Sequence, residues 1–281
     1  MRVTLLVAVL GLAGLAMPGH LPTLAAEAQV LDFSVPELMR VTALDLVFEH
    51  FGAAIAASAR VSDISTDEIF LSHWEAAAAS SFNGAALRTR LAGTLEGKFS
   101  VEDLKALGEF FRSDFGHRIS NLERAVAQLS VGDQATALRE GTTQSAGAGA
   151  VRTTQLDDLM DLMSAEISGV MAGQSMRALL LGMSVSHQRG DIEVPWQEID
   201  AQVEAMMPGL LADHTRAQRA MMAYAYRGLS DDELERYIAF LRTAPAQKLY
   251  AIAAYAVGQI VARSMSSFGE TLAARMASVN I

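Results

Sequence analysis

The sequence contains no cysteine among its 281 residues, and this absence limits its chemistry. Disulfide bonds, thiol nucleophiles, zinc–thiolate sites and iron–sulfur clusters are excluded. A lipidated cysteine after a leader segment is excluded for the same reason. A chain without thiols also avoids mispairing in an oxidising compartment, so the absence is compatible with export.

Aromatic residues and prolines are scarce as well, at 6% and six residues respectively. Hydrophobic residues nevertheless make up 51% of the chain, and the small residue alanine recurs throughout. This combination favours closely packed helices over a β-sandwich, which would need more Val, Ile, Thr and Tyr. The formal net charge is −10 without any basic run, so we expect no nucleic-acid partner.

The N-terminus carries the pattern of a secretory signal peptide. Arg2 precedes 15 uncharged apolar residues from Val3 to Met17, and small residues follow a Pro-Gly break as far as Ala28. The apolar stretch is shorter than the roughly 20 residues of a membrane-spanning helix. We therefore expect a signal peptide over residues 1–28, cleaved within residues 25–28, rather than a retained anchor. No apolar run of 18 residues follows, so we expect no membrane span in the mature protein and a periplasmic rather than extracellular location.

One 20-residue pattern occurs twice. SVEDLKALGEFFRSDFGHRI begins at Ser100, and SDDELERYIAFLRTAPAQKL begins 130 positions later at Ser230. Each copy reads as a helix, a break near Ser113 or Thr243, and a second helix. An acidic residue three positions after each serine predicts a capping box, in which each of the two side chains accepts a hydrogen bond from the other's backbone N–H. The identical pairs are Ser100/Ser230, Leu104/Leu234, Phe110/Phe240 and Arg112/Arg242.

The repeat predicts an all-α helical bundle built from two related halves, each ending in a capped helix-turn-helix. The halves are expected over residues 29–140 and 155–281. Residues 141–154 are rich in Gly, Ser, Thr and Ala and read as a linker. Upstream, the run LMRVTALDL at Leu38 loosely matches LMDLMSAEI at Leu159. The apolar periodicity predicts one helix over residues 36–58 and another over residues 156–185.

The run from Asp231 to Leu249 resembles the helix-turn-helix hallmark of the DUF2059 family, whose members are exported helical proteins of bacteria. The residues that fit its Phe-Tyr-x-Ser-Pro-x-Gly-x-Lys pattern are Phe240, Leu241, Thr243, Pro245 and Lys248, with Ala246 or Gln247 in place of glycine. In the first copy they are Phe110, Phe111, Ser113, Gly116 and Arg118, with Phe115 in place of proline. The resemblance covers the two copies rather than the whole chain. It implies an all-α fold and export, and it implies no mechanism because the family has no established activity.

Motifs for catalysis and cofactor binding are missing from the sequence. His50, His73, His117, His187 and His214 stand alone, and no His-x-x-x-His, phosphate-loop or dinucleotide pattern occurs. Paired carboxylates at Asp157–Asp158 and Asp231–Asp232 fall at expected helix starts, where the helix dipole accounts for them. Arg112 and Arg242 fall at expected helix C-termini, where a cation complements the negative end of the helix dipole and can donate to free carbonyl oxygens. We therefore assign no catalytic, cofactor-binding or metal-binding residue and no cofactor.

Methionine is the one unusual enrichment, with 14 residues. The second half contains Met160, Met163, Met171, Met176, Met183, Met206, Met207, Met221 and Met222. Methionine fills irregular helical cores and lines adaptable grooves, and its thioether also binds Cu(I). We expect a non-catalytic protein that binds an envelope protein or an apolar small molecule. The alternatives are an enzyme with a dispersed active site and a methionine-based periplasmic copper-binding protein.

Overall fold

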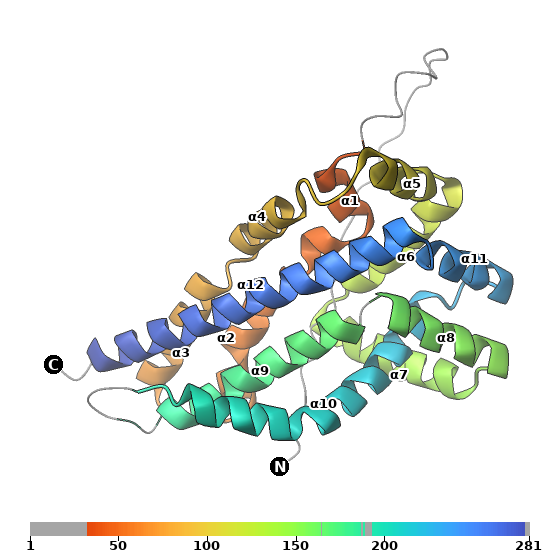
Figure 1. The fold of residues 1–281 in the computed structure, drawn as a ribbon. Helices are drawn as coiled ribbons and strands as arrows, with labels where there is room; N and C mark the ends of the chain where they lie inside the picture. The colour runs from red at the N-terminus through yellow and green to blue at the C-terminus, as the bar shows by residue number, and fades with distance from the viewer. Residues whose placement is uncertain (1–32, 164, 187, 189–192, 279–281) are drawn as a thin grey trace.

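The structure is a computed structural model that describes residues 33–163, 165–186, 188 and 193–278 (Figure 1). These residues form α-helices and one short 3-10 helix, with no strand in the described ranges, and the predicted all-α class is confirmed. The signal peptide predicted over residues 1–28 lies outside the described residues. The elements are α1 (Val35–Val41), η1 (Leu44–Leu46), α2 (Phe51–Val61), α3 (Glu68–Ser81), α4 (Gly84–Leu95), α5 (Val101–Phe111), α6 (Asp114–Ala127), α7 (Val131–Ala146), α8 (Ala150–Met163), α9 (Ala165–Val185), α10 (Trp196–Ala225), α11 (Asp231–Leu241) and α12 (Ala244–Ala277).

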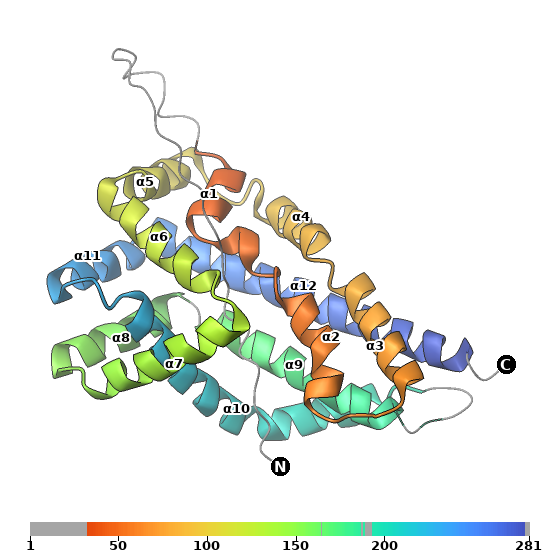
Figure 2. The same ribbon diagram turned by 180° about the vertical axis from the view of Figure 1, so that it is seen from behind.

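The long helix α12 organises the molecule. It packs against α3 and α4 on one side and against α9 on another (Figures 1 and 2). α7 packs against α10, and α8 packs against α11, at the end of the molecule where α12 begins (Figure 2). The apolar interior accordingly contains a large cluster around α2, α3, α9 and α12. A smaller cluster lies between α6, α8, α11 and the end of α10.

Both tryptophans pack against a glycine of a neighbouring helix. Trp74 is fully buried, donates from Nε1 to the carbonyl oxygen of Ile55 at 2.7 Å, and meets the Phe268 ring edge-on. A Cβ at Gly182 would lie 2.7 Å from this indole. A Cβ at Gly269 would overlap the indole of Trp196 in the same way. The glycines therefore let α9 and α12 approach the large rings closely.

Side-chain caps begin most of these helices. Ser100 Oγ accepts from the Asp103 N–H at 3.1 Å, and Asp103 accepts from the Ser100 N–H at 3.0 Å. Ser230 and Glu233 make the same pair of bonds at 3.2 and 2.9 Å. Both predicted capping boxes are confirmed, and they fix where α5 and α11 begin.

One of the two helices predicted from periodicity is interrupted in the structure. The chain between Pro36 and Ser58 forms α1, η1 and α2, so the continuous helix predicted there is wrong. Ala43 has a left-handed φ of 56°, which ends α1 and turns η1 into the core. In the second range, α8 ends at Met163 and α9 begins at Ala165, on either side of residue 164, which lies outside the described residues, so the single helix predicted over residues 156–185 stays a prediction.

The segment expected to link the halves, residues 141–154, is largely helical. α7 continues to Ala146 and α8 starts at Ala150, so only the short turn around Gly147 separates them. Gly141 is buried, and a Cβ there would overlap the carbonyl oxygen of Ala220 on α10. The small residues thus serve close packing of α7 on α10 as well as the turn. The division of the chain into two halves stays a prediction.

The two helix-turn-helix segments contact each other through a stacked ring pair and two ion pairs. The Phe110 ring stacks on the Phe240 ring, with centroids 3.5 Å apart and an interplanar angle of 5°. Asp103 pairs with Lys248 at 2.6 Å, and Arg118 pairs with Glu233. Asp103 corresponds to Glu233 in the repeat, and Arg118 corresponds to Lys248. The two ion pairs are therefore reciprocal: in each, the acidic residue near the start of one segment pairs with the basic residue near the end of the other.

Arg112 and Arg242 occupy the C-cap positions of α5 and α11, as their place in the repeat predicts. Their side chains extend to other helices, where Arg112 pairs with Glu37 at 2.9 Å and Arg242 pairs with Asp158 at 2.8 Å. These arginines therefore anchor α1 and α8 to the helix-turn-helix segments.

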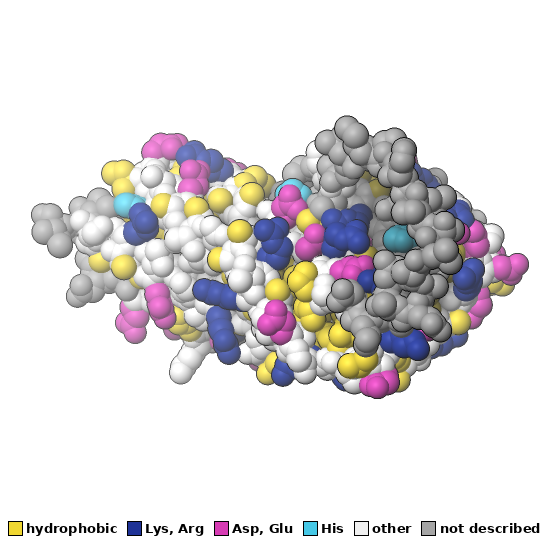
Figure 3. Space-filling view, turned by 90° about the horizontal axis from the view of Figure 1, so that it is seen from above, with side chains coloured by type: hydrophobic (Ala, Val, Ile, Leu, Met, Phe, Trp, Pro, Cys, Tyr) yellow, Lys and Arg dark blue, Asp and Glu magenta, His cyan; other side chains and the backbone are white. Residues whose placement is uncertain are grey.

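The described surface mixes charges of both signs. Seen from above, Lys and Arg side chains lie among Asp and Glu side chains (Figure 3). Arg60, for example, pairs with Glu68 at 2.8 Å and with Glu75 at 3.0 Å. Among the helices of the described ranges, none is both long enough and apolar enough to cross a membrane.

Candidate functional site

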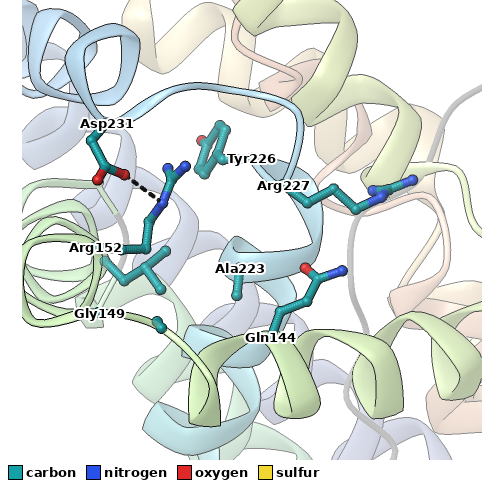
Figure 4. Close-up of a pocket in the computed structure, with 9 residues that line it drawn as sticks. Gln144, Gly149, Arg152, Ala223, Tyr226, Arg227 and Asp231 are labelled. Atoms are coloured by element: carbon teal, nitrogen blue, oxygen red, sulfur yellow. Dashed lines mark ion pairs between the residues drawn. The ribbon is translucent and has the colours of Figure 1, made fainter.

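A pocket of about 470 Å³ opens where the α7–α8 turn meets the C-terminal end of α10 and the loop that leads to α11 (Figure 4). We call it the Arg152 pocket. Its volume falls within the roughly 300–1,000 Å³ that small-molecule sites occupy. The lining residues are Gln144, Ala148, Gly149, Arg152, Leu156, Ala223, Tyr226, Arg227 and Asp231.

Local sequence features place these residues together. The turn around Gly147 and Gly149 reverses the chain, so that the end of α7 and the start of α8 form one wall. Tyr226 is the C-cap of α10 and is almost fully buried. Asp231 is the first residue of α11, where the Ser230 capping box fixes it. Helix ends thus form most of the pocket.

Arg152 is the most constrained polar residue of the pocket. Its Nε pairs with Asp231 Oδ1 at 3.0 Å, and its Nη2 donates to the carbonyl oxygen of Leu229. In Figure 4 the guanidinium lies beside Asp231 and the Tyr226 ring, whereas the guanidinium of Arg227 points away from it. Nη1 of Arg152 is buried and has no hydrogen-bond partner among the described residues. An arginine that cannot lose its charge therefore keeps one donor nitrogen unused.

Gln155, one turn further along α8, shows a complementary feature. Only 5% of the residue is exposed, and its Nε2 donates to the Asp231 carbonyl oxygen at 2.9 Å. Its Oε1 is buried without a partner in the described part of the chain. A free donor and a free acceptor thus lie on the side of α8 that faces the start of α11.

A partly buried carboxylate lies behind the pocket wall. Glu123 Oε1 on α6 accepts hydrogen bonds from the hydroxyls of Tyr226 at 2.7 Å and Tyr237 at 2.5 Å. The Tyr237 hydroxyl also lies 3.5 Å from that of Tyr250 on α12. Burial raises the pKa of Glu123 to about 7, although the two hydroxyl hydrogen bonds act in the opposite direction. Burial, with Glu123 nearby, raises the pKa of the Tyr226 and Tyr237 hydroxyls well above their usual value.

This cluster is connected to the pocket through one residue. Tyr226 lines the pocket and donates to Glu123, whereas Glu123 itself is not a lining residue. The carboxylate therefore acts on a bound molecule only through the position or protonation of Tyr226.

The histidines singled out in the sequence do not line the pocket. His50 and His117 are exposed, His73 is partly buried, and His187 lies outside the described residues. His214 on α10 is partly buried, its Nε2 has no partner among the described residues, and burial lowers its pKa. In the described ranges, no three His, Asp or Glu side chains come together as a metal site.

The methionines are divided between the core and the surface. Met160 and Met222 are buried in the smaller core cluster, and Met163 packs against it. Met183 and Met206 are exposed by 44% and 42%. The side chain of Met171 lies outside the description. Cu(I) binding by these thioethers stays a prediction.

In the comparison with known proteins, one family model matches part of the chain. A family model described as an uncharacterized protein conserved in bacteria (DUF2059) matches residues 85–144. The matched segment runs from α4 into α7 and contains the first helix-turn-helix, which confirms the resemblance seen in the sequence. The second copy, residues 230–249, lies outside this match, so two copies of the motif stay a prediction. No curated protein and no solved structure matches the chain.

Proposed function

We propose that this chain is an exported, non-catalytic binding protein of the bacterial cell envelope that holds a small molecule in the Arg152 pocket. The observation that carries the proposal is a pocket of ligand size with a fixed arginine whose Nη1 has no partner. The signal-peptide pattern of residues 1–28 supports export, with the periplasm as the expected compartment. The family match is consistent with a bacterial protein and assigns no activity.

Binding fits this site better than catalysis does. The lining carboxylate, Asp231, is already paired with Arg152, and it is not poised to accept a substrate proton. The remaining walls are largely small or apolar, as at Ala148, Leu156 and Ala223. Such a site can hold and orient a molecule without contributing a reacting group.

Native mass spectrometry of the mature protein tests this function. Protein purified from the periplasm without denaturation should carry an extra mass that denaturation releases. Ala148→Trp should remove that mass, because the indole fills the turn side of the pocket. Ala201→Trp, at an exposed position on α10, is the matched control and should retain it. Equal retention of the bound species by both variants contradicts the proposal, as does wild-type protein that neither carries a bound species nor binds an added small molecule.

An enzyme with a dispersed site is the second candidate, because Glu123 has a pKa near neutrality and contacts Tyr226. A carboxylate with such a pKa suits general acid–base catalysis. If this is correct, wild-type protein converts a substrate in an activity screen, and Glu123→Gln lowers the rate by about 100-fold or more. A screen in which wild-type protein converts nothing contradicts it.

We also propose that the chain arose by internal duplication, with the two helix-turn-helix segments related by a pseudo-twofold axis. The reciprocal pairs Asp103–Lys248 and Arg118–Glu233 support this relationship, because a twofold axis exchanges each pair with the other. The stacking of Phe110 on its counterpart Phe240 supports an axis that passes near these rings. An experimental structure in which residues 100–127 do not superimpose on residues 230–257 contradicts the proposal.

A further inference from the structure

We propose that the ligand of the Arg152 pocket is a small organic acid whose single carboxylate pairs with Nη1 of Arg152 and whose apolar body lies against the α8 and α10 walls. This inference deepens the proposed function and rests on it. It also modifies the expectation of a purely apolar ligand.

The unused nitrogen of Arg152 identifies the chemistry of the partner. A guanidinium keeps its charge in proteins, so a buried N–H without an acceptor is costly. Asp231 and the Leu229 carbonyl oxygen already satisfy Nε and Nη2, which leaves Nη1. A carboxylate oxygen is the acceptor that forms the strongest hydrogen bond with such a donor.

The guanidinium is also held in place before a ligand arrives. Asp231 fixes its Nε edge, and the Ser230 capping box in turn fixes the start of α11. Preorganisation of this kind lowers the entropic cost of binding. Nη1 is shielded from solvent in the structure, so the inference requires the side chains around it to move before a carboxylate can contact it.

The charge already present in the pocket limits the acid to one negative charge. The carboxylate of Asp231 lies 3.0 Å from Arg152 Nε and repels a second anionic group at the same guanidinium. A phosphate dianion is disfavoured for this reason, and Arg152 offers it only one nitrogen without a partner. Leu156, Ala223 and Ala148 provide the apolar wall for the rest of the ligand.

Isothermal titration calorimetry with matched probes tests the inference. Octanoate, octanamide, octylamine and octyl phosphate share one apolar chain and differ in the head group. Each is titrated into mature full-length protein from which co-purified species have been removed by dialysis. Octanoate should bind about 10- to 100-fold more tightly than octanamide, the usual effect of a charged hydrogen bond. Octylamine and octyl phosphate should bind more weakly than octanoate.

Variants assign the effect to Arg152. Arg152→Gln should abolish the preference for octanoate over octanamide while leaving the binding of octanamide within about threefold of wild type. Arg216→Gln is the matched control, because Arg216 lies on α10 in an exposed pair with Asp213 and does not line the pocket. It should retain the full preference. Circular dichroism and thermal unfolding establish that each variant is folded. If Arg152→Gln does not fold, the probe series with wild-type protein alone decides the question.

Some results would overturn the inference alone, and others would overturn the proposed function as well. Equal binding of octanoate and octanamide, or a co-purified neutral species with no binding of octanoate, leaves a binding protein whose ligand is not an acid. Failure of every probe to bind, together with no co-purified species, removes both the inference and the proposed function.

Discussion

Phe110 stacks face to face on Phe240, the residue 130 positions later that corresponds to it in the predicted repeat. Phe111 packs edge-on against the same Phe240 ring, with centroids 5.4 Å apart. Together with the two reciprocal ion pairs, this contact joins segments from opposite ends of the chain. We expect it to be a main link between α5–α6 and α11–α12.

A double-mutant cycle on Phe110→Ala and Phe240→Ala measures this link. Both rings are partly buried, so each single substitution should cost about 2 kcal/mol in the free energy of unfolding. The double variant should cost about 1 kcal/mol less than the sum, because the stacking energy is lost only once. Urea unfolding monitored by circular dichroism gives these values. Additive effects would show that the stacked rings do not contribute as a pair.

Glu123 predicts a specific pH dependence of stability. Its pKa is about 7 in the folded protein and near 4.5 in the unfolded chain, so the folded state binds more protons between these values. The stabilising contribution is therefore complete below pH 4.5 and is lost as the pH rises through about 7, by about 3 kcal/mol in total. Burial lowers the pKa of His214. Its contribution to stability therefore rises with pH in the range below the usual histidine pKa of 6.5.

Chemical unfolding of wild type and Glu123→Gln from pH 4.5 to 8 isolates this contribution. The difference in unfolding free energy between the two proteins should change by about 3 kcal/mol across the range, because the His214 contribution is common to both. A difference that stays constant with pH would mean that the Glu123 carboxyl is more exposed to solvent than the structure describes.

Gly141 and Gly93 predict opposite effects of the same substitution. Gly141→Ala gains helix propensity, but its Cβ would overlap the Ala220 carbonyl oxygen, so we expect a net loss of about 2 kcal/mol. Gly93→Ala in α4 meets no atom within 4 Å and should stabilise the protein by about 0.5–1 kcal/mol. Thermal unfolding of both variants gives the comparison. A stabilising Gly141→Ala would show that α7 and α10 are not in close contact there.

The sequence predicted the start of those helices whose first turn is capped by nearby side chains. The caps at Ser100 and Ser230 need only a serine and an acidic residue three positions later. The break at Ala43 could not be predicted in this way, because no glycine or proline marks it and the left-handed φ depends on how η1 packs. The segment after Gly141 was misleading for a related reason: small residues occur both in flexible linkers and where helices pack closely.

The candidate site was harder to predict than the fold. Arg152 is the only charged residue in residues 141–154. A single charge in a segment of small and polar residues could have marked it as a candidate site residue, but the overall composition of the segment does not show this. Glu123 and Tyr226 are 103 positions apart, and nothing in either local sequence marks them as partners. Only the packing of α6 against the end of α10 brings them together.

The most direct test of the account is a crystal structure of the mature protein soaked with octanoate. The account predicts density for the acid in the Arg152 pocket, with a carboxylate oxygen within hydrogen-bond distance of Arg152 Nη1 and the alkyl chain against Leu156 and Ala223. An Arg152 pocket that contains only water at a saturating concentration of octanoate would contradict it.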